Sequence, residues 1–244
     1  MNIATVYEDE DLLVFNKPAG IITHPKNIDD KQDSVTGWLI KKYPYLKNVG
    51  EPFIASEKEI PRAGVAHRLD KETSGLLIAA KNNKAFFYLK NLFQERKIRK
   101  YYLALVIGIP KESKGMISAP LGRLGLKRTT RIMGKKLIDK KEAVTEYKVL
   151  KTYNFGPATY SLLEVTPLTG RTHQIRVHLH SIGHPIVCDK IYGGKKKICP
   201  VQLNRLFLHA QKLEFTSPSG QRLHLEVELP NELTSFLNSL TISP

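Results

Sequence analysis

Strand-like and helix-like segments follow one another along the sequence, an order compatible with an α+β fold. Three observations are compatible with this class but would not by themselves select it. Apolar runs typical of strands outnumber the amphipathic stretches typical of helices. No internal repeat and no change of composition marks a linker. A hydrophobic fraction of 41% is enough to bury a core, and 244 residues fit one large domain or two small ones.

Five elements are predicted before residue 95, beside one irregular segment. Two short strands flank the acidic turn Glu8–Asp11 in a hairpin-like pattern. Helices are predicted where apolar residues recur at helical spacing, and a buried strand where they run continuously. In chain order these are strands at Thr5–Tyr7 and Leu12–Phe15, a helix at Ser34–Lys42 with Ser34 as N-cap and Val35, Trp38 and Leu39 inward, an irregular surface loop at Tyr43–Gly64, a strand at Leu76–Ala80 and a helix at Lys84–Gln94.

The second half of the chain is predicted to be richer in strands. Aromatic and β-branched content indicates most of them, and a turn at Thr169–Gly170 precedes the one helix. The predicted elements are strands at Ile98–Ile107, Val144–Tyr153 and Thr159–Val165, a helix at His173–Ile182, and strands at Phe207–Phe215 and Leu223–Leu229.

The segment His67–Asp70 has the composition of a catalytic turn. It places an imidazole, a guanidinium and a carboxylate within four residues, directly before Thr73-Ser74-Gly75 and the buried strand. A carboxylate on a turn that leads into a buried strand is held on a rigid scaffold, which suits a nucleophile or an acid–base group. The alternative is structural: Asp70 pairs with Arg68 or caps the turn.

The chain is strongly basic, with 38 Lys and Arg against 23 Asp and Glu and a net charge of +15. An excess of this size favours a polyanionic partner, and a membrane surface would also attract it. Eight cations lie in the segment Gly122–Lys141, and its internal glycines Gly125 and Gly134 suggest a mobile loop that orders on a phosphate backbone. A solvated loop is the alternative. The eight are Arg123, Lys127, Arg128, Arg131, Lys135, Lys136, Lys140 and Lys141. Lys195–Lys197 form a weaker second cluster, for which solvent-exposed lysines without a binding role are the favoured interpretation.

Other partners and cofactors have little support. No apolar run is long enough to span a bilayer, and no signal-peptide pattern opens the chain. No Gly-rich phosphate loop or dinucleotide fingerprint is present. Cys188 and Cys199 form no ligand pattern, so we expect ordinary side chains, no disulfide framework and a cytoplasmic location.

Four histidines between 173 and 184 raise the question of a metal site. On a helix, His173, His180 and His184 would share a face, and three imidazoles can hold zinc. However, Arg176 lies on the same stripe, and a cation beside a metal ion is unfavourable. We therefore expect no metal, and a helix whose polar face lines a cleft.

The stretch HRLDKETSG resembles the HRLDxxTSG signature of the RluA-type pseudouridine synthases, which convert uridine in RNA to pseudouridine. The resemblance extends from about Tyr7 to Phe236. It includes three further segments in the family's order, Asn16–Gly20, Arg99–Val106 and Leu168–His178. His67 and the Thr-Ser-Gly ending match the RluA branch rather than the branch with Gly before Arg-Leu-Asp.

The resemblance implies roles for individual residues. Asp70 is the expected nucleophile, Tyr102 the aromatic platform and proton-transfer group, and Arg176 the guanidinium that keeps Asp70 ionised. Because the target uridine must be flipped out of the RNA, Arg68 is expected to hold the vacated space or to contact neighbouring RNA, with a buried ion pair as the alternative. The expected substrate contacts are His67, Arg68, Thr73, Lys127, Arg128, Arg131, Arg171 and His173. Tyr101 is expected on the other face of the strand, packed in the core.

The implied fold is an α+β pseudouridine synthase fold, a bent, mostly antiparallel mixed sheet with flanking helices and a central active-site cleft. Residues 1–244 are expected to form a single catalytic domain, with no room for the S4-type domain that precedes it in many relatives. The expected enzyme is a monomeric cytoplasmic isomerase without cofactor or obligate protein partner, which acts on ribosomal or transfer RNA.

Two rival functions remain at this level. A non-catalytic RNA-binding or RNA-chaperone module would share the basic surface but would not need Asp70, Tyr102 and Arg176 together. A metal-dependent nuclease could use the histidine segment, and insensitivity to chelators would exclude it.

Overall fold

The computed structural model describes residues 3–27, 29–55, 57–124, 127–130, 138–193 and 199–242. The chain divides into two compact units. We call Met1–Arg99 with Ala210–Val227 the first unit, and Lys100–His209 with Glu228–Pro244 the second unit.

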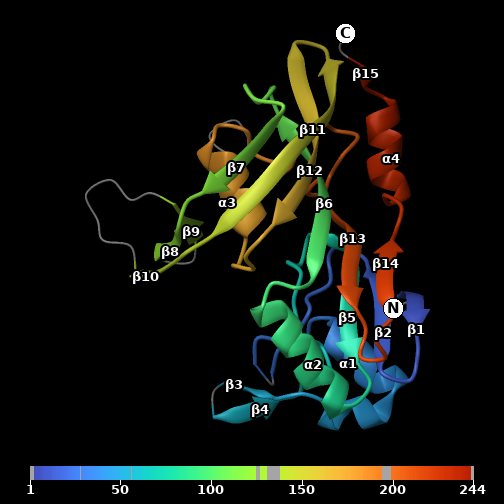
Figure 1. Ribbon diagram of the computed structural model, residues 1–244. Coiled ribbons are helices and arrows are strands. Elements are labelled where there is room, and N and C mark those ends of the chain that lie inside the picture. Colours follow the sequence, from blue (N-terminus) through green and yellow to red (C-terminus); the bar gives the residue numbers. More distant parts are fainter. Residues whose placement is uncertain are drawn as a thin grey trace. The chain divides into compact units, whose positions relative to one another are not determined.

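The first unit is built on a sheet in which β5 occupies an inner position (Figure 1). The strand order is β1-β2-β5-β13, and β14 pairs with β13. β1 pairs antiparallel with β2, as do β2 with β5 and β13 with β14. The strands are β1 (Ala4–Glu8), β2 (Leu12–Lys17), β5 (Ser74–Ala80), β13 (Leu208–Thr216) and β14 (Arg222–Glu226).

Both predicted helices of the first unit are present, and side-chain caps begin them. In α1 (Val35–Lys42), the Ser34 hydroxyl accepts a hydrogen bond from the backbone N–H of Gly37. In α2 (Asn83–Gln94), which packs on β5, the Asn82 side chain accepts one from Ala85. Each cap satisfies a backbone donor that the first helical turn leaves unpaired.

The segment Tyr43–Gly64 is more ordered than the sequence predicts. It contains a 3-10 helix, η1 (Pro44–Asn48), and a small hairpin of β3 (Phe53–Ala55) and β4 (Lys58–Ile60). The prediction of an irregular loop was wrong because these elements are too short to show a periodic pattern. Their apolar side chains are few, and Leu46 and Ile60 are the ones buried.

The second unit is built around a long antiparallel hairpin of β11 (Val144–Phe155) and β12 (Ala158–Pro167). β6 (Arg99–Ile107) pairs with β12, while β7 (Lys114–Ser118) and β15 (Thr241–Ile242) pair with β11. The helices are α3 (Gln174–Ser181) and α4 (Asn231–Asn238) (Figure 1). The sequence did not predict α4, β7 or β15.

The basic segment Gly122–Lys141 contains strands where a mobile loop was expected. β8 (Leu121–Leu124) pairs antiparallel with β9 (Lys127–Thr129) and with β10 (Ile138–Lys141). Lysine and arginine weakened the sequence signal for strands, since their apolar stems support a sheet without adding hydrophobicity to the pattern. Gly125, Arg131, Gly134, Lys135 and Lys136 lie outside the described residues, as do Lys195–Lys197.

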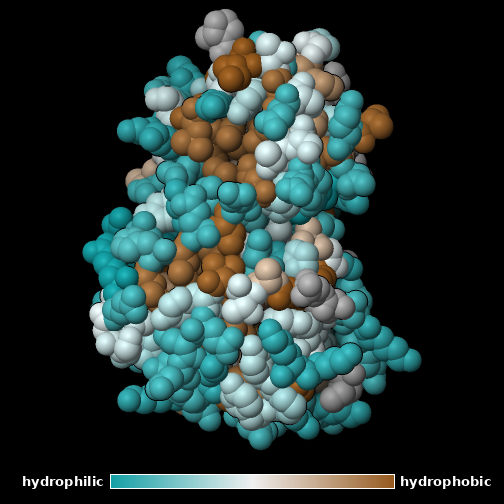
Figure 2. Space-filling view, turned by 90° about the vertical axis from the view of Figure 1, so that its right-hand side faces the viewer, coloured by the Kyte–Doolittle hydropathy of each residue, from teal (hydrophilic) through white to brown (hydrophobic). Residues whose placement is uncertain are grey.

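No helix among the described residues is long and apolar enough to cross a membrane. The face seen in Figure 2 carries hydrophilic residues over most of its area, with hydrophobic patches among them.

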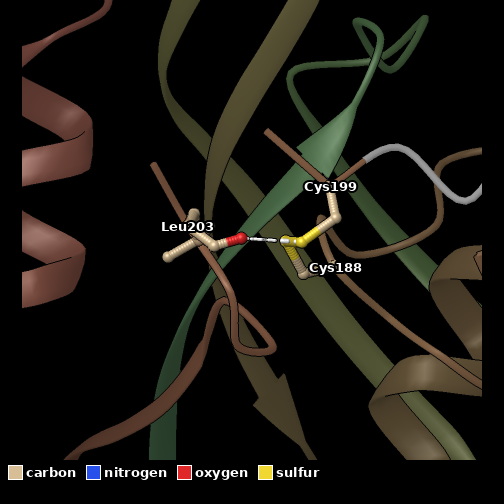
Figure 3. The surroundings of a disulfide bond; sticks show 3 residues. All are labelled: Cys188, Cys199 and Leu203. Carbon is tan, nitrogen blue, oxygen red and sulfur yellow. Dashed lines mark hydrogen bonds between the residues drawn. A yellow bond between two sulfur atoms is a disulfide. The ribbon is translucent and has the colours of Figure 1, made fainter. Parts of the chain in front are cut away.

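A disulfide joins Cys188 and Cys199, which corrects the expectation of ordinary side chains (Figure 3). The two cysteines are 11 positions apart in the sequence, but their Cα atoms lie 4.4 Å apart, within the range that a disulfide spans. Sequence spacing alone did not show this proximity. The carbonyl oxygen of Leu203 lies 2.9 Å from the sulfur of Cys188 and 2.7 Å from that of Cys199. A disulfide sulfur has no hydrogen, so only the reduced thiols could donate to this oxygen.

Reducing the disulfide should lower the free energy of unfolding by about 3 kcal/mol, because the bridge restricts a short loop of the unfolded chain. Urea unfolding with and without dithiothreitol measures the difference, and Cys199→Ser should reproduce it without reductant. Thiol titration of the unfolded, unreduced protein should detect no free cysteine. Two titratable thiols would contradict the bridge.

Candidate active site

Asp70 lies on a tight turn directly before β5. The Thr73 N–H donates to the Asp70 carbonyl oxygen at 3.1 Å, and β5 begins at Ser74. All seven residues of β5 are buried, so the turn is attached to one of the most enclosed strands of the first unit. Asp70 itself is half-buried. This places a carboxylate at the edge of a rigid element, as the sequence predicted.

The buried side chain of Lys17 binds the backbone of this turn. Its side chain is 0% exposed, and its ammonium donates to the carbonyl oxygens of Pro18 at 2.9 Å, Lys71 at 3.2 Å and Thr73 at 2.7 Å. An ammonium has three donors, and three carbonyl acceptors satisfy them. Because a buried charge without partners is very costly, the Lys17 ammonium and the carbonyls of the turn must stay together.

Two further contacts join the segment after β2 to the Asp70 turn. The Gly20 N–H donates to the Lys71 carbonyl oxygen at 2.7 Å. The Thr23 hydroxyl donates to the Leu69 carbonyl oxygen at 2.8 Å and accepts from the Leu69 N–H at 3.2 Å. The backbone is therefore held on both sides of Asp70.

Gly75 is required by a close approach of two strands. Its φ of +117° lies in a region that side chains rarely adopt, and a Cβ there would stand 2.2 Å from the Ala210 carbonyl oxygen. The glycine of the Thr-Ser-Gly ending thus allows β13 to lie against the first residues of β5.

The second unit holds a buried ion pair between Arg176 of α3 and Asp189. Arg176 Nε donates to Asp189 Oδ2 and Arg176 Nη2 to Asp189 Oδ1, each at 2.8 Å, and Arg176 is 2% exposed. Asp189 Oδ1 also accepts from the backbone N–H groups of Ile191 and Tyr192, at 2.9 Å each. This two-pronged geometry is specific to arginine.

The protonation of Asp189 follows from these partners. Burial acts to raise the pKa of its carboxyl, but the hydrogen bonds and charge of Arg176, with the two backbone amides, outweigh burial and lower it. Asp189 is therefore ionised at neutral pH. The role of Asp189 was not predicted from the sequence, where the available signal is an acid directly after the apolar stretch Ile186–Cys188.

Tyr192 connects Arg176 to the basic strand β9. The Arg176 guanidinium carbon lies 5.3 Å from the centre of the Tyr192 ring, within cation–π range. The Tyr192 hydroxyl lies 2.9 Å from His173 Nδ1 and accepts from the Arg128 N–H at 3.1 Å. The Tyr192 side chain therefore contacts both the helix that carries Arg176 and the strand that carries Arg128.

Residues 11–181 match the model of the family described as RNA pseudouridylate synthase. The chain belongs to this family. A pseudouridine synthase described as ribosomal large subunit pseudouridine synthase D, from Nitrosomonas europaea, is 38% identical over 98% of this chain. The enzyme of the same name from Pseudomonas aeruginosa is 37% identical, also over 98% of this chain. The chain spans 65% of the first relative's length and 72% of the second's.

Two solved structures are similar to this chain. Human RNA Pseudouridylate Synthase Domain Containing 4 has a TM-score of 0.74 and 26% identity, covering 98% of this chain and 94% of that one. Human RNA Pseudouridylate Synthase Domain Containing 1 has a TM-score of 0.69 and 26% identity, covering 100% and 97%. The RluA-type resemblance and the α+β pseudouridine synthase fold predicted from sequence are confirmed.

The residues predicted from the family motifs are divided between the units. In the first unit, Asp70 is joined by Arg68, which is exposed, and Thr73, which is 2% exposed. His67 has a structural bond: its Nε2 accepts from the Ile78 N–H at 3.0 Å, and its ring centre lies 4.7 Å from that of Phe93. His67 and Thr73 therefore support the turn, and Arg68 is the member open to solvent.

In the second unit, Tyr102 lies on β6 opposite Val165 of β12 and is 9% exposed, while its neighbour Tyr101 is half-buried. Arg171 is exposed, and its Nε donates to the Glu142 carbonyl oxygen at 3.1 Å. His173 begins α3 with a left-handed φ of 57°. Lys127 is exposed on β9, and Arg131 lies outside the described residues.

The other histidines near α3 have protein partners. His178 lies between the Thr145 hydroxyl and the Ala119 carbonyl oxygen, at 2.8 Å from each. Burial lowers the pKa of His178 more than the bond to Ala119 raises it. His184 Nδ1 donates to the Ile107 carbonyl oxygen at 2.9 Å. These imidazoles therefore connect α3 and its following loop to the strands.

Replacing Lys17 by methionine should destabilise the protein by about 3 kcal/mol, because three carbonyls would lose a charged donor in a buried site. Urea unfolding measures the loss. The exposed Lys31→Met is the matched control and should change stability by less than about 0.5 kcal/mol. Equal effects of the two substitutions would contradict the role of Lys17.

The Asp189 carboxyl should contribute a pH-dependent part of stability. Its folded pKa lies below the ordinary 3.8, so its stabilisation is complete above pH 3.8 and disappears as the pH falls through the folded value. Unfolding free energies of wild type and Asp189→Asn at several pH values test this. The gap between them should be largest near neutral pH and narrow below about pH 4. A gap independent of pH would mean that Asp189 is not an ionised partner of Arg176.

Proposed function

We propose that the protein is an RNA pseudouridine synthase, an isomerase that converts uridine within RNA to pseudouridine. The observation that carries this proposal is the Asp70 carboxylate on a turn held by Lys17, Gly20 and Thr23, in a chain of this family. The reaction breaks the N-glycosidic bond, turns the base and reattaches it through carbon. It requires a placed carboxylate rather than a redox cofactor or a phosphate-binding loop.

Three residues carry the chemistry in this proposal. Asp70 is the nucleophile, because an ionised carboxylate can attack the sugar or the base. Tyr102 stacks on the extruded base and transfers a proton through its hydroxyl. Arg176 stabilises the charge of Asp70. The ion pair with Asp189 engages Nε and Nη2 of Arg176. This pair supports the proposed role because it restricts the orientation of the guanidinium group, and with it the direction of Nη1.

We further propose ribosomal RNA as the substrate, supported by the names of the bacterial relatives. The contacts proposed for the RNA are His67, Arg68, Thr73, Lys127, Arg128, Arg131, Arg171 and His173. Arg68, Lys127 and Arg171 have the strongest support because they are exposed cations. For His67 and Thr73, an indirect contribution through the turn is the better supported role.

The remaining expectations complete the proposal. Residues 1–244 act as one catalytic domain, as a monomer, in the cytoplasm where ribosomal RNA is modified. The two cysteines form a disulfide, and disulfides are rare in the cytosol, so the cysteines no longer support a cytoplasmic location. The proposed substrate class is the remaining support for that location.

Pseudouridine mapping across total RNA, with and without the gene, tests the substrate. A ribosomal uridine that loses its modification in the deletion strain, and regains it with the purified protein, supports the proposal. Loss confined to transfer RNA would change the proposed substrate to transfer RNA and leave the proposed reaction unchanged. Absence of any lost site, with no product from the purified protein, would overturn the proposal.

Asp70→Asn should abolish pseudouridine formation, lowering the rate by several powers of ten, because the amide keeps the shape but lacks the charge and nucleophilicity. RNA affinity should stay within a few-fold of wild type. Tritium release from uridine-labelled RNA measures turnover, and filter binding measures affinity. The exposed Asp33→Asn provides the matched control and should turn over normally. Substantial turnover by Asp70→Asn would remove Asp70 from the mechanism.

A further inference from the structure

Four side chains of the first unit form an electropositive group beside the Asp70 turn. We call His24, Phe53, Arg62 and Arg68 the His24 cluster. The Phe53 ring joins two of them: its centre lies 6.0 Å from that of His24, edge to face, and 5.8 Å from the guanidinium carbon of Arg62. The charges of Arg62 and Arg68 both lower the pKa of the His24 imidazole, so both guanidinium groups lie near it.

The cluster has no counter-charge within the part of the chain that the structure describes. There, neither Arg62 nor Arg68 forms an ion pair with a carboxylate, and His24 Nδ1 and Arg62 Nε are buried without a hydrogen-bond partner. Burial, together with the charges of Arg62 and Arg68, lowers the pKa of His24 to about 3. The imidazole is therefore neutral at physiological pH, and the charge of the cluster is that of its two guanidinium groups.

The backbone attaches this cluster to the catalytic turn. Thr23, which precedes His24, exchanges two hydrogen bonds with Leu69, which lies between Arg68 and Asp70. On the other side, the Val65 N–H donates to the Arg62 carbonyl oxygen at 3.0 Å, and Val65 forms a β-bridge with Ala79 of β5. His24, Arg62 and Arg68 therefore keep their places relative to Asp70.

We propose that the His24 cluster binds a phosphodiester group of the RNA backbone beside the target nucleotide. The inference rests on the proposed function and adds a binding site to it. A guanidinium group matches the oxygens of a phosphate with two parallel hydrogen bonds, and two arginines without a protein anion favour such a ligand. The unpaired buried nitrogens support the same reading, because native proteins rarely leave buried polar groups unsatisfied without a functional reason.

A phosphate fits this site better than a base does. Stacking of a base would require an open aromatic face, but Phe53 is half-buried and already contacts both His24 and Arg62. The contact with Phe53 restricts the guanidinium of Arg62, which lowers the entropy lost when it binds an oxyanion. A purely structural pair of arginines would instead be expected to bind carboxylates or carbonyl groups.

Salt-dependent binding of Arg62→Gln tests the proposal, with Lys58→Gln as the matched control. Lys58 is exposed on the neighbouring strand β4, so both substitutions remove one positive charge near the hairpin. The probe is the ribosomal RNA fragment that the wild type modifies. Arg62→Gln should weaken binding roughly tenfold and flatten the plot of log affinity against log salt by about 0.7 to 0.9. Lys58→Gln should keep the wild-type slope. An unchanged slope for Arg62→Gln would overturn the proposal.

A second measurement identifies the phosphate and guards against misfolding. Uncharged methylphosphonate is placed at one backbone position at a time around the target uridine. One position should weaken wild-type binding but have no further effect on Arg62→Gln, whereas equal losses in both proteins at every position would overturn the proposal. Arg62→Lys, which keeps the charge, should retain most of the salt slope while losing part of the affinity. Circular dichroism and urea unfolding establish that each variant is folded.

The inference and the proposed function fail in different ways. At saturating RNA, Arg62→Gln should still form pseudouridine, because the cluster contacts the backbone and not the reacting atoms. Normal turnover with a wild-type salt slope and an unaltered methylphosphonate profile would reject the cluster and keep the enzyme. Absence of pseudouridine with wild-type protein would reject the enzyme, whatever the slope shows.

Discussion

The hydrogen bonds of the Lys17 ammonium are the interaction on which the rest of the first unit depends. Its three carbonyl partners belong to two stretches that are more than 50 residues apart in the chain. A buried positive charge tolerates no rearrangement that would leave it unpaired, so it keeps the end of β2 and the Asp70 turn together. The turn's carbonyls are directed inward by this interaction. These backbone contacts therefore restrict the position of Asp70.

The second unit uses a different buried cation for a similar purpose. Arg176 is held by the flat carboxylate of Asp189 and covered by the ring of Tyr192, so its orientation is restricted as well as its position. A lysine collects carbonyl groups from several directions, whereas an arginine presents a planar fork. The contrast explains why Lys17 closes a turn, while Arg176 connects a helix to a neighbouring loop and, through Tyr192, to β9.

Most long elements could be predicted from sequence because their signals are local. Ser34 and the apolar spacing after it predicted α1, and the run from Leu76 to Ala80 predicted β5. The failures involve elements whose partners are distant in the chain. β3 and β4 are too short for periodicity, and the strands of the basic segment gain their order from pairing. The motifs identified Asp70, Tyr102 and Arg176 as candidates, but they gave no indication of Asp189 or of the His24 cluster, since both depend on spatial proximity.

Cys188 has a backbone φ of 60°, in the left-handed region where glycine is the residue without steric penalty. One residue therefore carries both a covalent link and a locally unfavourable backbone. The two contributions have opposite signs, so the tolerance of this position to change depends on which is removed. Glycine would lose the bridge and relieve the backbone, whereas serine would lose the bridge and keep the penalty. Asp189 follows Cys188 directly in the chain. A substitution of Cys188 by glycine could therefore remove the disulfide and relax the backbone without changing the carboxylate that binds Arg176.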